Sequence, residues 1–425
     1  MPGMHAALVR FLTFAILVFP VFLKADNWPA WRGPFGTGKS AEKEFPIEWS
    51  RQKNVRWRVA LPERGNSSPI VWGQKVFVTQ ALEGQGLRQL ICFDRKTGKT
   101  LWKKNVEFDL KEPTHRTNPY CSASPVTDGK RVVVSHASAG IFCYDMDGRE
   151  LWRRNLGEQK HIWGNGASPL LYKDLCFLNF GPGPRTFLIA LNVKDGKTVW
   201  QHDETGGDSG ITKEGEKGKW IGSWTTPIVM DGKTGDELLM SYPGRVVGFD
   251  PLKGKEIWNC GGLNPLVYTS PLYEDGLIVV MGGFRGTAMG VRAGGQGDVT
   301  MTHQLWTRPK EKQRIGSGVL TGGHVYILNE DGVAQCIEAR KGKVVWEERL
   351  NGPGKNGKSW SSMVVAGDKL YAINQSGDAF ILRASPKFEL LAVNSVGEET
   401  QSSMAFSGGE IYIRTYKSLW CISKK

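Results

Sequence analysis

The feature that most constrains the fold is a short phrase that recurs along the chain: Gly, then Lys or Arg, two further residues, and Trp. Five full copies and one degenerate copy end at Trp102, Trp152, Trp200, Trp258, Trp306 and Trp346. The first and last of these tryptophans are 244 positions apart, so the repeat is about 49 residues long. A unit of this length cannot bury its apolar faces alone, and several units must stack on one another.

A second phrase opens each repeat and gives the number of copies. Two small, mostly hydroxylated residues precede a proline at Pro69, Pro125, Pro169, Pro227 and Pro271. Three further openings lack the proline and are placed at Ser317-Gly318-Val319, Ser361-Ser362-Met363 and Ser402-Ser403-Met404. Three apolar runs separated by glycine turns follow each opening, and the Trp strand comes fourth. Eight four-stranded antiparallel units predict an all-β, eight-bladed β-propeller.

The two ends of the chain predict how the ring closes. The last repeat stops after three strands, whereas residues 54–59, with Trp57 in the motif register, precede the first opening. We expect this N-terminal strand to pair with residues 419–422 and complete the eighth blade, so that residues 54–425 form the propeller. Closure of this kind removes the sheet edges that would otherwise favour aggregation.

The N-terminus has the pattern of an export signal. Arg10 precedes an apolar run over residues 11–23, and Ala25 is a small residue at a suitable cleavage point. We expect residues 1–25 to be a signal peptide, the mature protein to be periplasmic or secreted without a transmembrane span, and residues 26–53 to be an extended segment. The alternative is an uncleaved anchor. No cysteine follows the apolar run, so a lipid-modified N-terminus at that junction is not expected.

Charge, histidine spacing and cysteine placement indicate which partners, metals and cross-links are not expected. The formal net charge is +13, or +11 once Arg10 and Lys24 are removed, but Lys and Arg form no long run, and we expect no nucleic-acid partner. The histidines lack metal-ligand spacing, so no metal site is expected. Four of the seven cysteines occupy one recurring position of the repeat, which predicts small buried hydrophobes without disulfides, at Cys92, Cys143, Cys336 and Cys421.

The repeat motif resembles that of a known family. The segment from Cys92 to Trp102, with Asp94, Thr97, Gly98 and Lys99, is similar to the Ala-x-Asp-x-x-Thr-Gly-Lys-x-x-Trp motif of pyrroloquinoline-quinone-type propeller repeats. The resemblance covers roughly residues 49–422, and residues 28–38 also resemble the start of exported bacterial members. It implies a structural role, packing against the adjacent blade, for Trp57, Trp102, Trp152, Trp200, Trp258, Trp306 and Trp346.

Two branches of this family imply different functions. Quinoprotein dehydrogenases hold the quinone with Ca²⁺ and a catalytic Asp, and several carry a disulfide between adjacent cysteines. This chain has no Cys-Cys pair and lacks their long insertions. Its size and closure match the other branch, the non-catalytic outer-membrane assembly propellers. We therefore expect a monomeric scaffold without catalytic residues or cofactor. The alternative is a dehydrogenase that uses pyrroloquinoline quinone and Ca²⁺ to oxidise an alcohol or sugar.

A binding site is expected where loops lead into the innermost strands. In each opening, the residue three positions before the proline, or before the residue that replaces it, should lie in a ring around the propeller axis. These residues are Asn66, Ser122, Gly166, Trp224, Tyr268, Gly316, Trp360 and Gln401. With neighbouring residues, the candidate ligand-binding set is Asn66, Arg116, Asn118, Tyr120, Trp163, Asn165, Trp224, Tyr268, Arg285, Trp360 and Gln401. Aromatics beside amides and arginines suit stacking on a sugar or quinone, so an envelope protein or glycan is the expected partner. The alternative is that Trp224 and Trp360 simply fill the funnel.

Overall fold

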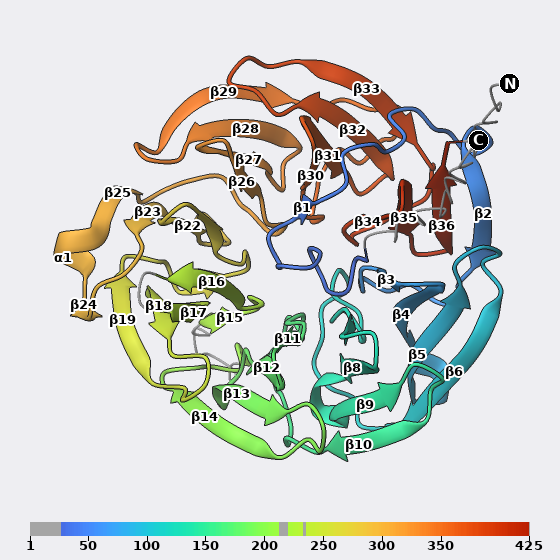
Figure 1. Ribbon diagram of the computed structural model, residues 1–425, viewed down its shortest axis with the longest axis horizontal. Coiled ribbons are helices and arrows are strands. Elements are labelled where there is room, and N and C mark those ends of the chain that lie inside the picture. Colours follow the sequence, from blue (N-terminus) through green and yellow to red (C-terminus); the bar gives the residue numbers. More distant parts are fainter. Residues whose placement is uncertain (1–26, 212–219, 233–234, 425) are drawn as a thin grey trace, which may run out of the picture.

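The computed structural model describes residues 27–211, 220–232 and 235–424, and in it eight four-stranded antiparallel sheets surround a central axis (Figure 1). The expected eight-bladed β-propeller is therefore confirmed. The proposed signal peptide, residues 1–25, lies outside the described residues. Within each sheet the first strand lies nearest the axis and the fourth at the perimeter (Figure 1).

The first four blades follow one another along the chain. Blade 1 consists of β3 (Ile70–Trp72), β4 (Lys75–Leu82), β5 (Leu87–Asp94) and β6 (Thr100–Glu107). Blade 2 consists of β7 (Val126–Thr127), β8 (Arg131–Ser135), β9 (Ile141–Asp145) and β10 (Glu150–Arg154). Blade 3 consists of β11 (Leu170–Tyr172), β12 (Leu175–Phe180), β13 (Thr186–Asn192) and β14 (Thr198–Glu204). Blade 4 consists of β16 (Ile228–Gly232), β17 (Gly235–Tyr242), β18 (Arg245–Phe249) and β19 (Glu256–Gly261).

The remaining blades complete the ring. Blade 5 consists of β21 (Leu272–Glu274), β22 (Leu277–Met281), β23 (Ala288–Arg292) and β25 (Gln304–Arg308). Blade 6 consists of β26 (Val319–Thr321), β27 (His324–Leu328), β28 (Val333–Glu338) and β29 (Lys343–Arg349). Blade 7 consists of β30 (Val364–Ala366), β31 (Lys369–Ile373), β32 (Asp378–Arg383) and β33 (Leu390–Ser395). Blade 8 consists of β34 (Ala405–Ser407), β35 (Glu410–Arg414), β36 (Ser418–Ser423) and β2 (Val55–Ala60).

A few short elements lie outside the blades. β1 (Lys39–Ser40) pairs with β30, β24 (Gly297–Asp298) pairs with β19, and β15 (Gly222–Ser223) pairs with β20 (Leu266–Val267). Among the described residues, the helical elements are α1 (Thr300–His303) and two single 3₁₀ turns, Glu83–Gln85 and Ala137–Ala139. No helix among the described residues is long and apolar enough to cross a membrane.

The apolar character of the middle strands follows from their position between neighbouring blades. Every residue of β12 and of β22 is buried, because each blade packs on a neighbour with both faces. One core cluster joins Phe177 and Leu188 of blade 3 to Met240 and Val247 of blade 4. The outermost strands instead alternate between exposed and partly buried residues, as in β6. The core is thus divided among the interfaces between blades.

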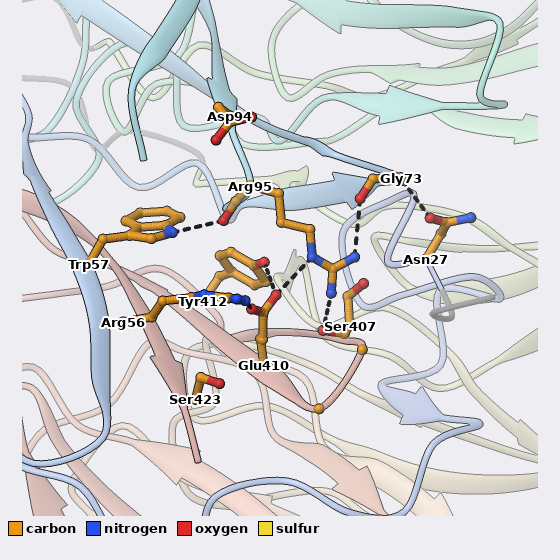
Figure 2. Close-up of polar contacts among 12 residues, drawn as sticks. Asn27, Arg56, Trp57, Gly73, Asp94, Arg95, Ser407, Glu410, Tyr412 and Ser423 are labelled. Carbon is orange, nitrogen blue, oxygen red and sulfur yellow. Dashed lines mark hydrogen bonds and ion pairs between the residues drawn. The ribbon is translucent and has the colours of Figure 1, made fainter. Parts of the chain in front are cut away.

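The ring closes where the two ends of the chain meet. β2 pairs with β36 in antiparallel register, with Val55 opposite Ile422 and Val59 opposite Leu419, which confirms closure by the N-terminal strand. Across the adjoining interface the buried Glu410 carboxylate of blade 8 accepts a hydrogen bond from Arg95 Nε of blade 1 at 2.7 Å (Figure 2). It also pairs with Arg56 of the closing strand. Charge-assisted contacts therefore tie the first and last blades together.

The motif tryptophans connect neighbouring blades. Six indole N–H groups donate to a backbone carbonyl in the turn between the third and fourth strands of the next blade: Trp57 to Arg95, Trp102 to Met146, Trp152 to Val193, Trp200 to Pro251, Trp306 to Ala339 and Trp346 to Ser385. The glycine of the motif makes this contact possible. Gly98 has a φ of 72°, and a Cβ there would lie 2.8 Å from the Trp57 ring.

Trp258 does not pack as the resemblance implies. It is completely buried, and its indole donates to the Glu237 carboxylate of its own sheet at 2.6 Å. The reason lies in blade 5, where residues 293–303 replace the short glycine turn. Part of this segment, β24, pairs in parallel with the outer edge of β19, with Gly297 opposite Trp258. The next blade therefore offers Trp258 no glycine turn of the usual kind.

The opening phrases form a closed circle of hydrogen bonds. The backbone N–H of the second small residue in each opening donates to the equivalent hydroxyl of the next blade, at 2.9 to 3.1 Å, through Ser68, Ser124, Ser168, Thr226, Ser270, Ser317, Ser362, Ser403 and back to Ser68. Side-chain hydroxyls are needed at this position because each satisfies a buried N–H that the sheet ladders do not reach. The circle lies at the inner ends of all eight blades.

The circle shows that the sixth opening lies one residue earlier in the sequence than the repeat pattern predicts. Ser317 takes the position of Ser68, and β26 begins at Val319 as β3 begins at Ile70. Gly318 therefore occupies the proline position, where the sequence had suggested Val319. A glycine is needed here because a Cβ would lie 2.6 Å from the carbonyl oxygen of Tyr326.

Residues 27–40 cross the centre of the ring, and we call them the channel plug (Figure 1). Trp28 forms a bridge with Val71 of blade 1, and β1 extends the inner edge of blade 7. Arg32 is buried and donates to the carbonyls of Thr37 and Gly318. Lys39 pairs with Glu274 of blade 5 at 2.6 Å. The channel of the propeller is thus filled by a segment that precedes the first repeat.

All seven cysteines are buried and none forms a disulfide. The four at the recurring position lie on the third strand of their sheets, as predicted, and pack as small hydrophobes. Burial raises the pKa of the Cys121 thiol to about 12, and its sulfur lies 3.4 Å from His136 Nδ1. Neutral thiols of this kind are inert in the folded protein.

Candidate funnel site

A cavity of about 370 Å³ lies on the propeller axis, where loops enter the innermost strands. Hydroxyl groups from the circle of openings line it. The channel plug pairs with the inner strands β3 and β30 beyond those openings, so Trp31 of the plug forms the floor of the cavity. The upper wall is aromatic and amide in character, with Asn66, Asn118, Trp163, Trp224, Tyr268, Phe284, Gln313, Trp360 and Gln401. This volume is at the lower end of the range for small-molecule pockets, about 300 to 1,000 Å³.

The structure brings together seven of the candidate ligand-binding residues around this cavity: Asn66, Asn118, Trp163, Trp224, Tyr268, Trp360 and Gln401. Tyr120 and Asn165 instead line a separate cavity of about 20 Å³, large enough for one water molecule. Arg116 and Arg285 line neither cavity, and the guanidinium of Arg285 lies over the ring of Phe284. The candidate set therefore divides into a shared site and four residues outside it.

Several lining residues are absent from the candidate set. Ile315 occupies the funnel position of blade 6, where the one-residue register error had placed Gly316. Trp31 lies far from the repeats in sequence, and no periodic signal marks it. Phe284 precedes the candidate Arg285 and lines the cavity, whereas Arg285 does not. Alignment of the openings on their second hydroxyl residue, which places Ser317 with Ser68, predicts Ile315. Trp31 and Phe284 reach the cavity only through tertiary contacts.

Aromatic rings on one side of the cavity hold each other in place. Trp224 donates its indole N–H to the Gly164 carbonyl at 2.8 Å. Tyr268 meets the Trp224 ring edge-on, with 5.0 Å between centroids, and His161 does so at 4.8 Å. Trp163 lies beside Trp224 at 5.9 Å with an interplanar angle of 37°. Because each ring is fixed by a neighbour or a hydrogen bond, these rings form a preorganised concave wall.

Amide side chains hold the loops that form the rim. Asn118 donates to the carbonyls of Trp163 and Asn165, at 2.7 and 3.1 Å, and thereby fixes the loop that carries Trp163. Asn66 donates to the Thr117 carbonyl at 2.9 Å and to the Gln401 side-chain oxygen at 3.4 Å. These bonds leave the Gln401 amide nitrogen and the Asn118 side-chain oxygen without a partner among the described residues, so both are available to a ligand.

The lining is uncharged. Among the described residues that line the cavity there is no Asp, Glu, Lys or Arg. His115 lies at the rim, and burial together with the neighbouring Arg116 lowers its pKa, so the ring is neutral at neutral pH. Burial also lowers the pKa of His161, behind Trp224, to about 4. The lining therefore offers aromatic faces, hydrogen-bonding groups and one imidazole, without an ionised carboxylate, ammonium or guanidinium group.

Quinone and calcium do not fit this lining. Ca²⁺ is bound through carboxylate and carbonyl oxygens, and no carboxylate of the described residues lines the cavity. No group of three or more potential metal ligands occurs in the described part of the chain. A quinone that bears several carboxylates requires cationic partners, and Arg116 and Arg285 lie outside the lining. The residues present therefore do not form a site for the quinone–calcium pair.

Solved structures share this fold. BamB from Moraxella catarrhalis aligns with a TM-score of 0.60 and 14% identity, over 86% of this chain and 96% of that one. A europium-containing methanol dehydrogenase aligns with a TM-score of 0.65 and 12% identity, over 92% of this chain and 90% of that one. At these identities the likeness shows the eight-bladed architecture alone.

Sequence comparison identifies the family. The chain is 23% identical over 368 residues to the outer membrane protein assembly factor BamB of Burkholderia pseudomallei, covering 77% of this chain and 87% of that protein. A quinone-dependent 1-butanol dehydrogenase of Thauera butanivorans is 22% identical over 276 residues, which cover 39% of that enzyme. The model of the family described as outer membrane protein assembly factor BamB matches residues 47–107, 87–347 and 298–423. The chain therefore belongs to this family, which is the branch that its size and ring closure match.

Proposed function

We propose that the protein is an exported, non-catalytic propeller that holds an envelope partner, a protein or a carbohydrate, at its funnel face. The observation that carries this proposal is the cavity itself: a preorganised wall of aromatic rings and amides without an ionised acid or base. Binding sites of this composition recognise shape and hydrogen-bonding groups. The closed ring presents these groups on a rigid scaffold. The protein acts as a monomer, because ring closure gives each of the eight blades two neighbours to pack against.

The similar sequences support an envelope role. The relatives in Burkholderia pseudomallei and Salmonella typhimurium are named as outer membrane protein assembly factors. Their partners belong to the envelope, so export of this chain through residues 1–25 is consistent with the same compartment. The uncharged cavity gives no support to the alternative, oxidation of an alcohol or sugar with pyrroloquinoline quinone and Ca²⁺.

Capture from an envelope extract tests the partner. The mature protein, the variant Trp224→Ala and the control Met301→Ala are immobilised in parallel, since Met301 is 94% exposed and lies outside the cavity lining. We expect the wild type and the control to retain the same partner and Trp224→Ala to lose it. Equal capture by Trp224→Ala would place the partner on another face.

A turnover assay tests the absence of catalysis. The purified protein is mixed with pyrroloquinoline quinone and Ca²⁺, and dye reduction is followed with alcohols and sugars. We expect no reduction above the protein-free rate, because the cavity has no carboxylate among its described lining residues. Turnover that saturates with substrate would reject the scaffold proposal.

A further inference from the structure

We propose that the funnel cavity binds the end of an uncharged saccharide chain. This inference rests on the proposed function and names the chemical class of the partner that the same face recognises. Four features of the described residues carry it: the uncharged lining, the fixed aromatic wall, the polar groups without a partner, and the closed floor.

The uncharged lining selects against ionic ligands. The described lining holds no Lys or Arg for a carboxylate or phosphate and no Asp or Glu for an amine, and burial of an unpaired charge is costly. Hydroxyl, amide and indole groups instead match a ligand whose polar groups are neutral hydroxyls. Neutral sugars have this chemistry, with many hydroxyls around a ring.

The aromatic wall suits the apolar faces of sugar rings. Trp163 and Trp224 lie 5.9 Å apart at 37° and form a shallow V. The hydrogen bond from the Trp224 indole to the Gly164 carbonyl holds the ring in one orientation, and Tyr268 packs edge-on against that ring. A sugar ring can place its C–H groups on such a surface without loss of side-chain entropy, because the rings are already ordered.

Polar groups of the same lining are available to sugar hydroxyls. The indole N–H of Trp360, the hydroxyl of Tyr268 and the amide nitrogen of Gln401 have no hydrogen-bond partner in the described part of the chain, yet all three residues line the cavity. A few convergent polar groups in an aromatic pocket determine how a small ligand is oriented. Donors on the rim and hydroxyl groups lower in the cavity would bind ring hydroxyls in this way.

The closed floor determines which part of a glycan enters. Trp31 lies across the base of the cavity, and the channel plug behind it contacts the inner strands of blades 1 and 7. A chain therefore cannot thread through the propeller. With about 370 Å³ available, the site holds the terminal part of a saccharide that enters from the face.

Titration with defined sugars tests this inference. The probes are the neutral malto-, cello-, xylo- and chito-oligosaccharides from two to six units, with oligogalacturonate as the charged comparison. Binding is measured by tryptophan fluorescence and calorimetry. We expect at least one neutral series to bind. Its affinity should stop changing once the saccharide is longer than the cavity can hold, and one protein should bind per chain end. Capacity that increases with chain length, or no saturable binding by any neutral series, would overturn the inference.

Variants connect the binding to the cavity. Trp224→Ala should weaken the sugar affinity at least about tenfold, the effect expected of a central aromatic contact. Gln401→Ala tests the same site without removing a ring, and Met301→Ala is the surface control. Thermal unfolding of each variant shows that the fold persists. Full affinity in both Trp224→Ala and Gln401→Ala would overturn the inference.

The outcome is separable from that of the proposed function. If no neutral sugar binds but Trp224→Ala loses an envelope protein in the capture assay, the saccharide inference fails and the scaffold proposal stands. If a sugar binds and is oxidised in the presence of quinone, the non-catalytic proposal fails instead.

Discussion

The ring closure gives a quantitative prediction at Glu410. This carboxylate is 3% exposed and accepts hydrogen bonds from Arg95 at 2.7 Å and from the Tyr412 hydroxyl at 2.5 Å, and it also pairs with Arg56 (Figure 2). The perturbation is Glu410→Gln, which keeps the shape of the side chain and removes its charge. Arg95, with a side chain only 7% exposed, would then remain buried without a counter-charge.

The magnitude follows from the burial of each pair. Removal of one partner of a buried ion pair costs about 3 to 5 kcal/mol, because the other charge stays desolvated. Arg95 keeps two backbone acceptors, at Gly73 and Ser407, so we expect a loss near the lower value, about 3 kcal/mol. The Arg56 side chain is 42% exposed, and its pair with Glu410 should add less than about 1 kcal/mol.

Urea unfolding followed by tryptophan fluorescence measures this loss. The double variant Arg95→Met/Glu410→Gln should cost about 2 kcal/mol less than the sum of the single variants, because it removes both charges. Asp147→Asn is the matched control, since Asp147 pairs with Lys75 at 2.8 Å but its side chain is 90% exposed, and we expect no measurable change. If Glu410→Gln unfolds at the wild-type urea midpoint, or if the single variants add without coupling, the account of closure given above is wrong.

Three further predictions concern buried groups. Burial lowers the pKa of His136 to about 3, so below about pH 6.5 the unfolded chain binds a proton that the folded chain does not. The free energy of unfolding should therefore fall by about 1.4 kcal/mol per pH unit between pH 6.5 and pH 3, and the difference between the urea midpoints at pH 7 and pH 5 should shrink in His136→Gln. Gly196→Ala should cost more stability than Gly244→Ala, because both have positive φ but a Cβ at Gly196 would lie 2.7 Å from the Trp152 ring; equal melting temperatures would contradict the packing account. A thiol reagent at pH 8 should label Cys121 only after unfolding, and rapid labelling of the native protein would show that its thiol is accessible.

Much of the fold could be predicted because its determinants are local. A glycine turn followed by Trp, an opening of small residues and apolar runs of strand length recur with a fixed period, and each copy specifies one blade. The missing fourth strand at the C-terminus and the extra strand at residues 54–59 indicated closure for the same reason. The candidate site was less predictable. Position in the repeat located Trp224, Tyr268 and Trp360 around the axis, and the neighbouring candidates Asn118 and Trp163 also line the cavity, but Trp31 and Phe284 were missed.

The sequence by itself determined the number of blades, their strand order and the closing strand, because these depend on patterns within each repeat and on how many repeats there are. Tertiary structure alone decided that Trp31 forms the floor of the cavity, that Trp258 is buried within its own blade, and that Glu410 faces Arg95. Each of these depends on contacts between segments far apart in the chain or on an irregular insertion. No periodic pattern encodes such contacts, since they arise only when the packed blades bring those side chains together.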